Sequence, residues 1–137
     1  MSALTTGARI VAEAALGASL GAMAFFSFLG APRAFAVFGD DAGAYVNDVF
    51  PRYYTLNLGL AALAVATLGT LVNGPASLAA VAGALLAAIC HAFARLWLIP
   101  KMETAGDDAF ERYHGWSVGL NTVAMLAVAG ALVAANL

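Results

Sequence analysis

A histidine and an arginine lie four residues apart inside the apolar stretch "CHAFARLWLIP" (residues 90–100). This spacing places His91 and Arg95 on one face of a helix. An arginine side chain stays protonated in proteins, and its charge would repel a bare metal cation beside the imidazole. A site that used both side chains would therefore favour an anion, such as a carboxylate, a phosphate or the propionate of a haem.

Other polar residues are expected close to this pair. If the chain reverses near Gly106, antiparallel packing brings Asn121 to the depth of His91 and Ser117 to the depth of Arg95. The candidate ligand-binding residues are Asn57, His91, Arg95, His114, Ser117 and Asn121, covered by Phe50, Pro51, Tyr53, Tyr54, Trp97 and Trp116.

Each candidate also has a purely structural interpretation. Arg95 could extend to the membrane interface beside Trp97. His91, Asn57 and Asn121 could serve only to hydrogen-bond neighbouring helices, as polar side chains do in membrane bundles. The sequence leaves both interpretations open.

The sequence contains no recognisable catalytic or metal-binding motif. It has two histidines and one cysteine, Cys90, and it lacks the HExxH and CxxC spacings of metal sites. A nucleophile elbow, a phosphate loop and a dinucleotide fingerprint are also missing, so no catalytic residue is assigned and an enzyme is disfavoured but left open. A haem is the one cofactor left open, with His91 or His114 as its axial ligand.

The composition is that of an integral membrane protein. Hydrophobic residues make up 63% of the 137 residues and charged residues 10%, with a mean hydropathy of +0.87. Soluble domains are about 25% charged. Most of the charged residues fall in two segments, 33–52 and 101–112, and no basic cluster suggests a nucleic-acid partner. The expected partners are the lipid bilayer and a small-molecule ligand.

Four apolar runs are long enough to cross a membrane, which takes about 20 residues. They cover about 9–31, 53–72, 76–99 and 116–135, and only "NGPAS" separates the second from the third. This pattern predicts an all-α integral membrane four-helix bundle, made of two antiparallel hairpins in a single domain, residues 1–137. One such bundle has a narrow core, so a transport path would form more readily in a homo-oligomer.

Basic residues predict the orientation of the bundle. Arg33, Arg52, Lys101 and Arg112 lie in the two long loops, whereas the "NGPAS" turn has no basic residue. Short loops rich in Lys and Arg stay cytoplasmic. We therefore expect a multi-pass protein of the cell membrane, with both long loops in the cytoplasm and both termini outside. All the aromatic residues flank these loops, which places the candidate site in the cytoplasmic half.

The two long loops resemble each other. "FLGAPRAFAVFGDDAGAY" (residues 28–45) and "LWLIPKMETAGDDAFERY" (residues 96–113) share a proline followed by a basic residue, then Gly-Asp-Asp-Ala, then a tyrosine. One interpretation is a parallel internal repeat of the hairpin, as in some transporters. The other is chance similarity between low-complexity helices.

Local signals predict helix starts and one ion pair. The aspartates after Gly39 and Gly106 can cap the next helices, so the second and fourth helices are expected to begin near Asp41 and Asp108. Pro51 falls inside the second helix or at a break in it. Arg9 and Glu13, four residues apart, are expected to pair with each other away from the site.

Four segments resemble the transmembrane-protein-205-like family: "GAMAFFSFLGAPRAF", "DVFPRYYTLNL", "ARLWLIPKM" and "FERYHGWSVGLN". The family consists of small four-helix membrane proteins, mainly of unknown function. The resemblance implies a helical membrane bundle and supplies no mechanism. His114 and Asn121 match the His-Gly-x-Ser-x-x-x-Asn pattern of the family, so the resemblance marks them as family positions.

Three functions remain possible from the sequence. The first is a membrane protein that binds or transports a small anionic or amphipathic molecule through the polar site in the cytoplasmic half. The second is a haem-binding redox enzyme or carrier that uses an intramembrane histidine. The third is a structural or assembly subunit of a membrane complex, in which the polar residues only specify helix packing.

Overall fold

The computed structural model describes residues 3–137, except for the side chains of residues 107 and 108, and this part of the chain is helical with no strand. The elements are α1 (Ala3–Phe25), η1 (Phe26–Gly30), α2 (Ala31–Phe38), η2 (Gly39–Asp41), α3 (Ala42–Gly69), α4 (Pro75–Phe93), η3 (Ala94–Leu98), α5 (Ile99–Glu103) and α6 (Asp107–Ala135). The predicted all-α class is confirmed.

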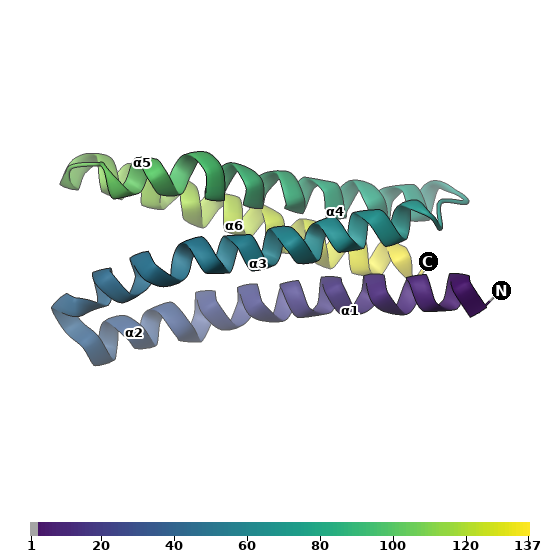
Figure 1. The fold of residues 1–137 in the computed structure, drawn as a ribbon, viewed down its shortest axis with the longest axis horizontal. Coiled ribbons are helices and arrows are strands. Elements are labelled where there is room, and N and C mark those ends of the chain that lie inside the picture. The colour runs from purple at the N-terminus through teal and green to yellow at the C-terminus, as the bar shows by residue number, and fades with distance from the viewer. Residues whose placement is uncertain (1–2) are drawn as a thin grey trace.

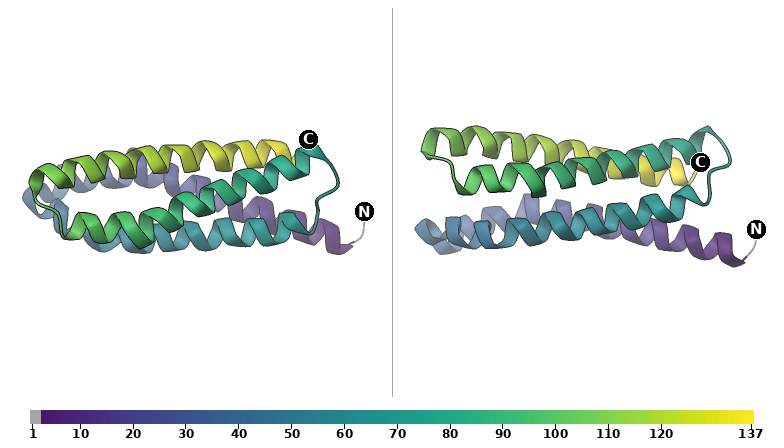
Figure 2. Two further views of the ribbon diagram at one scale, coloured as in Figure 1. Left: turned by 90° about the horizontal axis from the view of Figure 1, so that it is seen from above. Right: turned by 45° about the horizontal axis from the view of Figure 1, so that its top comes forward.

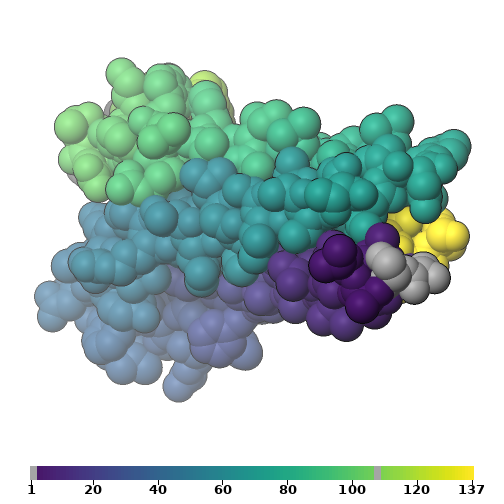
Figure 3. Space-filling view, turned by 45° about the vertical axis from the view of Figure 1, so that its right-hand side comes forward, coloured from purple at the N-terminus to yellow at the C-terminus, as the bar shows by residue number. Residues whose placement is uncertain are grey.

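The long helices pack as two antiparallel hairpins, α1 with α3 and α4 with α6 (Figure 1). The right-hand view in Figure 2 shows the α4–α6 hairpin alongside the α1–α3 hairpin. The N- and C-termini lie at the same end as the α3–α4 link, residues 70–74, and we call this the terminal end (Figure 3). The opposite end, which holds α2 and α5, is the connector end.

Three helical runs among the described residues are long and apolar enough to cross a membrane: Ala3–Gly69, Pro75–Glu103 and Ala109–Ala135. The protein is thus of the helical membrane class, but the structure has three such runs where the sequence predicted four separate ones. The first two predicted spans belong to one helical run, because the segments between them, η1, α2 and η2, are all helical and follow one another without a gap. This run reverses direction at Gly39, whose φ of 54° is the left-handed conformation that glycine adopts most easily.

Local predictions of helix boundaries are mostly confirmed. α3 begins directly after Asp41 and α6 begins at Asp107, and Pro51 lies inside α3. Asp41, the residue directly before α3, makes no cap hydrogen bond through its side chain. The 3₁₀ turn that precedes α3 already continues into the helix, which leaves the first turn less dependent on a side-chain cap. The side chain of Asp108 lies outside the described residues.

Each hairpin contains a π-helical turn directly before a proline-containing turn. The Ala31 N–H bonds to the Phe26 carbonyl and the Ile99 N–H bonds to the Ala94 carbonyl, both five residues back. Proline has no N–H and its ring clashes with the carbonyl four residues before it, so a wider turn accommodates Pro32 and Pro100 without breaking the helix. Each π-turn also rotates the side chains that follow it.

The two hairpins share this layout at a constant interval. η3 begins 68 residues after η1, and Pro100 follows Pro32 by the same interval. Positions that are buried in α1 are also buried 68 residues later in α4, as in the pairs Ala12 and Ala80, and Met23 and His91. The first helix of each hairpin therefore presents the same face to the bundle interior.

α4 and α6 approach each other closely at Gly83. A Cβ atom there would lie 2.8 Å from the Ala127 carbonyl oxygen and 3.1 Å from the Ala131 Cβ. Without a hydrophobic driving force between helices in lipid, close packing through small residues is a main source of bundle stability. The core of both hairpins is accordingly rich in alanine.

Candidate functional site

The candidate site is a groove at the connector end, which we call the connector groove. It has a volume of about 370 Å³ and lies between the η1–α2 segment and α6, with α3 at its base. Its lining residues are Phe26, Ser27, Phe28, Ala31, Pro32, Phe35, Phe50, Tyr53, Tyr54, His114, Ser117, Val118, Asn121, Thr122 and Met125. From His114 to Met125 the groove follows α6 for about 16 Å, at 1.5 Å per residue.

A chain of hydrogen bonds crosses the base of the connector groove. The Tyr53 hydroxyl donates to Asn121 Oδ1 at 2.5 Å, and Asn121 Nδ2 donates to Ser27 Oγ at 2.9 Å. These two bonds join α3, α6 and η1. Because a hydroxyl and an amide each have further donor or acceptor capacity, a bound molecule could hydrogen-bond here without breaking them.

The base is rigid because its polar and aromatic groups are packed together. The Tyr54 hydroxyl and Ser117 Oγ lie 2.7 Å apart in a buried hydrogen bond between α3 and α6. Phe26 stacks on Tyr53, with ring centroids 4.8 Å apart, and meets Phe50 edge-on. Aromatic pairs of this kind add to the stability gained from burial alone.

The connector groove carries no acidic, lysine or arginine side chain among its lining residues. His114 is exposed at one end of it and stacks on Phe110, with ring centroids 6.1 Å apart. The remaining walls are mostly aromatic and aliphatic. This combination suits a molecule with an apolar body and a polar group that forms hydrogen bonds, and it offers no fixed charge for an anion.

Asn57 lies outside the groove and has a clear structural partner. Its side chain is 0% exposed. It accepts a hydrogen bond from Ser19 Oγ at 2.7 Å and donates to the Tyr53 carbonyl at 3.0 Å. The side chain thus joins α1 to α3, as the structural interpretation of the sequence predicted.

His91 is also 0% exposed, and it lines neither the connector groove nor a cavity that lies at the terminal end. Neither ring nitrogen has a hydrogen-bond partner in the described part of the chain. Its ring centroid lies 5.9 Å from that of Tyr54, which separates it from the connector groove. Leaving a buried polar group unpaired costs about 1–3 kcal/mol.

Arg95 is half-buried and reaches a different helix from the one expected. Its Nε donates to Thr55 Oγ1 on α3 at 3.2 Å, and it does not line the connector groove. The π-turn η3 begins at Ala94, between His91 and Arg95, so the four-residue spacing does not follow α-helical geometry. The structure therefore joins His114, Ser117 and Asn121 around one groove and leaves Asn57, His91 and Arg95 outside it.

Of the aromatic residues predicted to cover the site, some line the connector groove and others lie outside it. Phe50, Tyr53 and Tyr54 line the groove, whereas Trp97 and Trp116 stack on each other on the outer face of the second hairpin, 6.1 Å between ring centroids. Pro51 does not line it. The sequence analysis did not predict the η1–α2 wall, including Ser27.

The residues present give limited support for a metal or haem. The described residues contain no group of three or more His, Cys, Asp or Glu side chains that could hold a metal ion. A haem needs open space beside its axial ligand. His91 is enclosed and His114 is exposed beside the groove, so only His114 meets this condition among the two predicted ligands.

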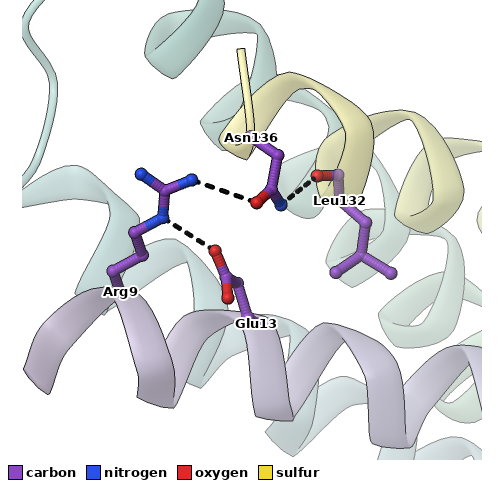
Figure 4. A network of polar contacts seen from close by, with 4 residues as sticks. All are labelled: Arg9, Glu13, Leu132 and Asn136. Carbon is purple, nitrogen blue, oxygen red and sulfur yellow. Dashed lines mark hydrogen bonds and ion pairs between the residues drawn. The ribbon is translucent and has the colours of Figure 1, made fainter. Parts of the chain in front are cut away.

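At the terminal end, polar contacts hold α1 against α6. Arg9 Nε lies 2.8 Å from Glu13 Oε1, which confirms the predicted pair. Arg9 also donates to Asn136 Oδ1 at 3.1 Å, and Asn136 Nδ2 donates to the Leu132 carbonyl (Figure 4). A second cavity of about 570 Å³ lies here, with Arg9 as the one charged residue in its lining. Because that guanidinium is already bonded, we assign no site to it.

Fold and groove together define a small helical membrane protein with a polar cluster at one end. The chain belongs to the family described as "Domain of unknown function (DUF4149)", which matches residues 14–111. It is 32% identical over 121 residues to an uncharacterized protein of Aquifex aeolicus (strain VF5), covering 88% of this chain and 90% of that protein. No solved structure matches. The more specific likeness to the transmembrane-protein-205-like family stays a prediction.

Proposed function

We propose that the protein is a multi-pass membrane protein that binds a small amphipathic molecule in the connector groove. The observation that carries this proposal is a groove with apolar walls and a hydrogen-bonding base, without a fixed charge in its lining. A ligand pocket of this kind has a mostly apolar lining with a few placed polar groups. The amphipathic class of ligand predicted from the sequence is thereby favoured over the anionic class.

The proposal includes four crossings of the bilayer. α1 and α3 have 23 and 28 residues, each more than the roughly 20 that a crossing needs, and they run antiparallel on either side of Gly39. The first helical run would therefore cross twice. The basic residues of both connectors favour a cytoplasmic connector end and outside termini.

Access to the groove would be sideways, from the lipid. Its outer wall includes Phe28, which is 70% exposed, together with the exposed Phe35 and Val118. In a membrane such apolar side chains face lipid tails, so a guest that is dissolved in the bilayer can reach the base without crossing water. Transport of this guest, and a homo-oligomer that would provide its path, stay predictions.

The proposal is tested by filling the groove. Ala31 is a half-buried lining residue, and Ala36 is exposed on the same helix outside the groove. Protein in lipid nanodiscs is mixed with a nitroxide-labelled long-chain alcohol and examined by electron paramagnetic resonance. We expect an immobilised component with the parent protein and with Ala36→Trp, and its loss with Ala31→Trp. An equal signal from all three proteins would contradict binding in the groove.

A structural or assembly role is the second candidate, because several polar groups already bond each other. Ser19 with Asn57, and Tyr53 with Asn121, link different helices without help from a ligand. If this is their whole role, Ala31→Trp leaves cellular function unchanged and the labelled alcohol binds nowhere. The same electron paramagnetic resonance experiment therefore separates the two candidates.

A further inference from the structure

His91 is the one described residue whose buried side-chain nitrogens have no hydrogen-bond partner. Buried polar groups in proteins are nearly always paired, with protein, water or ligand. A neutral imidazole has one N–H donor and one nitrogen acceptor on opposite sides of its ring. A hydroxyl group both donates and accepts, so it is the simplest partner for either nitrogen.

His91 lies at the seam between α3 and α4, behind the base of the connector groove. Tyr54 of α3 contacts the imidazole and also lines the groove, whereas His91 does not line it. Its hydroxyl is bonded to Ser117, and its ring packs against Phe50 and Tyr53. Tyr54 is therefore held from several sides, which makes the groove an unfavourable route to His91.

At the connector end, the α3–α4 seam is closed by Arg95, which is held by far fewer contacts than Tyr54. A single solvent-exposed hydrogen bond of 3.2 Å joins its Nε to Thr55 Oγ1 across the α3–α4 seam. Polar contacts at exposed positions contribute little to stability, and an arginine side chain is long and flexible. If the hydrogen bond between Arg95 and Thr55 broke, the α3–α4 seam would lose this polar contact at its connector end.

The repeat interval supports a correspondence between this seam and the connector groove. Arg95 follows Ser27 by the 68 residues that separate the two π-turns. Ser27 accepts a hydrogen bond from Asn121 of the opposite hairpin, and Arg95 donates one to Thr55 of the opposite hairpin. Each π-turn thus contacts the second long helix of the other hairpin. The short Ser27 side chain leaves the seam of the connector groove open, whereas the long Arg95 side chain covers the α3–α4 seam.

We propose a second polar site, closed in this structure, at the α3–α4 seam. His91 is its hydrogen-bonding group, and the contact between Arg95 and Thr55 is its lid. Its ligand is an uncharged amphiphile with a hydroxyl head, because the imidazole offers a donor and an acceptor. The site does not depend on ligand binding in the connector groove.

The test uses the reactivity of the two histidines toward diethyl pyrocarbonate, read by peptide mass spectrometry on the full-length protein in nanodiscs. His114 is exposed and serves as the internal reference. Arg95→Ser is expected to raise modification of His91 several-fold relative to His114. Dodecanol should reverse this increase, whereas dodecane, which lacks the hydroxyl, should not. Arg33→Ser, at an exposed position of the first hairpin, is the matched charge control and should change nothing.

A second variant keeps the proposal testable if Arg95→Ser fails to fold. Thr55→Val removes the acceptor of the Arg95 hydrogen bond and keeps the arginine, so it should expose His91 in the same direction. The proposal is overturned if His91 keeps its parental reactivity in both variants while the helical circular dichroism is unchanged. It is also overturned if Tyr54→Phe exposes His91 and Arg95→Ser does not, because the groove would then be the route.

Discussion

Two buried polar side chains in this bundle, Asn57 and His91, are equally inaccessible but differ in their partners. Asn57 both accepts and donates a hydrogen bond, whereas both nitrogens of His91 are unpaired in the described structure. Burial alone therefore does not show what a polar residue contributes. A paired group stabilises its helix contact, and an unpaired group lowers the stability of the state in which it is buried.

This difference predicts opposite effects of the same replacement. Asn57→Leu removes two hydrogen bonds and leaves the Ser19 hydroxyl unpaired, so we expect a loss of about 1–3 kcal/mol in the free energy of unfolding. His91→Leu removes two unpaired nitrogens, so its stability should equal or exceed that of the parent. Unfolding in mixed micelles by sodium dodecyl sulfate, followed by circular dichroism, measures both. Equal losses from the two variants would mean that His91 has a partner in the folded protein.

At the scale of the elements, helix spacing decides where a groove can form. α4 and α6 approach so closely that Gly83 faces the backbone of Ala127. α1 and α6 are held by Arg9 and Asn136 at the terminal end, and the connector groove lies between their hairpins at the other. The α6 helix thus packs tightly against α4 through its Ala127 region and also forms one wall of the groove.

The tight pair can be tested with glycine replacements. Gly83→Ala places a methyl group against the Ala127 carbonyl oxygen, so α4 and α6 must separate, and overpacking of this kind costs about 1–3 kcal/mol. Gly119→Ala is the control, because a Cβ atom there meets nothing within 4 Å. It should change the free energy of unfolding by less than about 1 kcal/mol. The same detergent unfolding assay applies, and similar values for the two variants would contradict close packing at Gly83.

The whole molecule has two unlike ends. The terminal end contains both termini and the α3–α4 link, and the connector end contains α2, α5, the groove and the Arg95 contact. If the connector end is cytoplasmic, as the basic residues predict, both proposed sites lie in the cytoplasmic half of the membrane. Their ligand would then be taken from the inner leaflet.

Thiol labelling tests this orientation. In a Cys90→Ala background, Asn73→Cys reports on the terminal end and Asp40→Cys on the connector end, since both positions are exposed. We expect a membrane-impermeant maleimide to label position 73 in intact cells, and position 40 only after the cells are permeabilised. The reverse pattern would place the connector groove in the outer half.

Several features followed from the sequence because they depend on neighbours along the chain. Composition and the length of the apolar runs determined the helical membrane class. The Gly-Asp segments indicated helix starts near residues 41 and 108, close to the observed starts at 42 and 107, and the Arg9–Glu13 pair follows from a spacing of four on one helix. In each case the relevant partner lies within a few residues, so local geometry is sufficient.

The candidate site was decided by the tertiary structure. His114, Ser117 and Asn121 were predicted correctly as neighbours on one helix, but their opposite wall comes from η1 and α2, far away in the sequence. A π-turn changed the direction of Arg95, and Tyr54 separated His91 from the groove. Which side chains meet across helices depends on the rotation and spacing of each helix, and a shift of one residue turns a side chain by about 100°. Periodicity in a low-complexity apolar sequence does not determine that rotation.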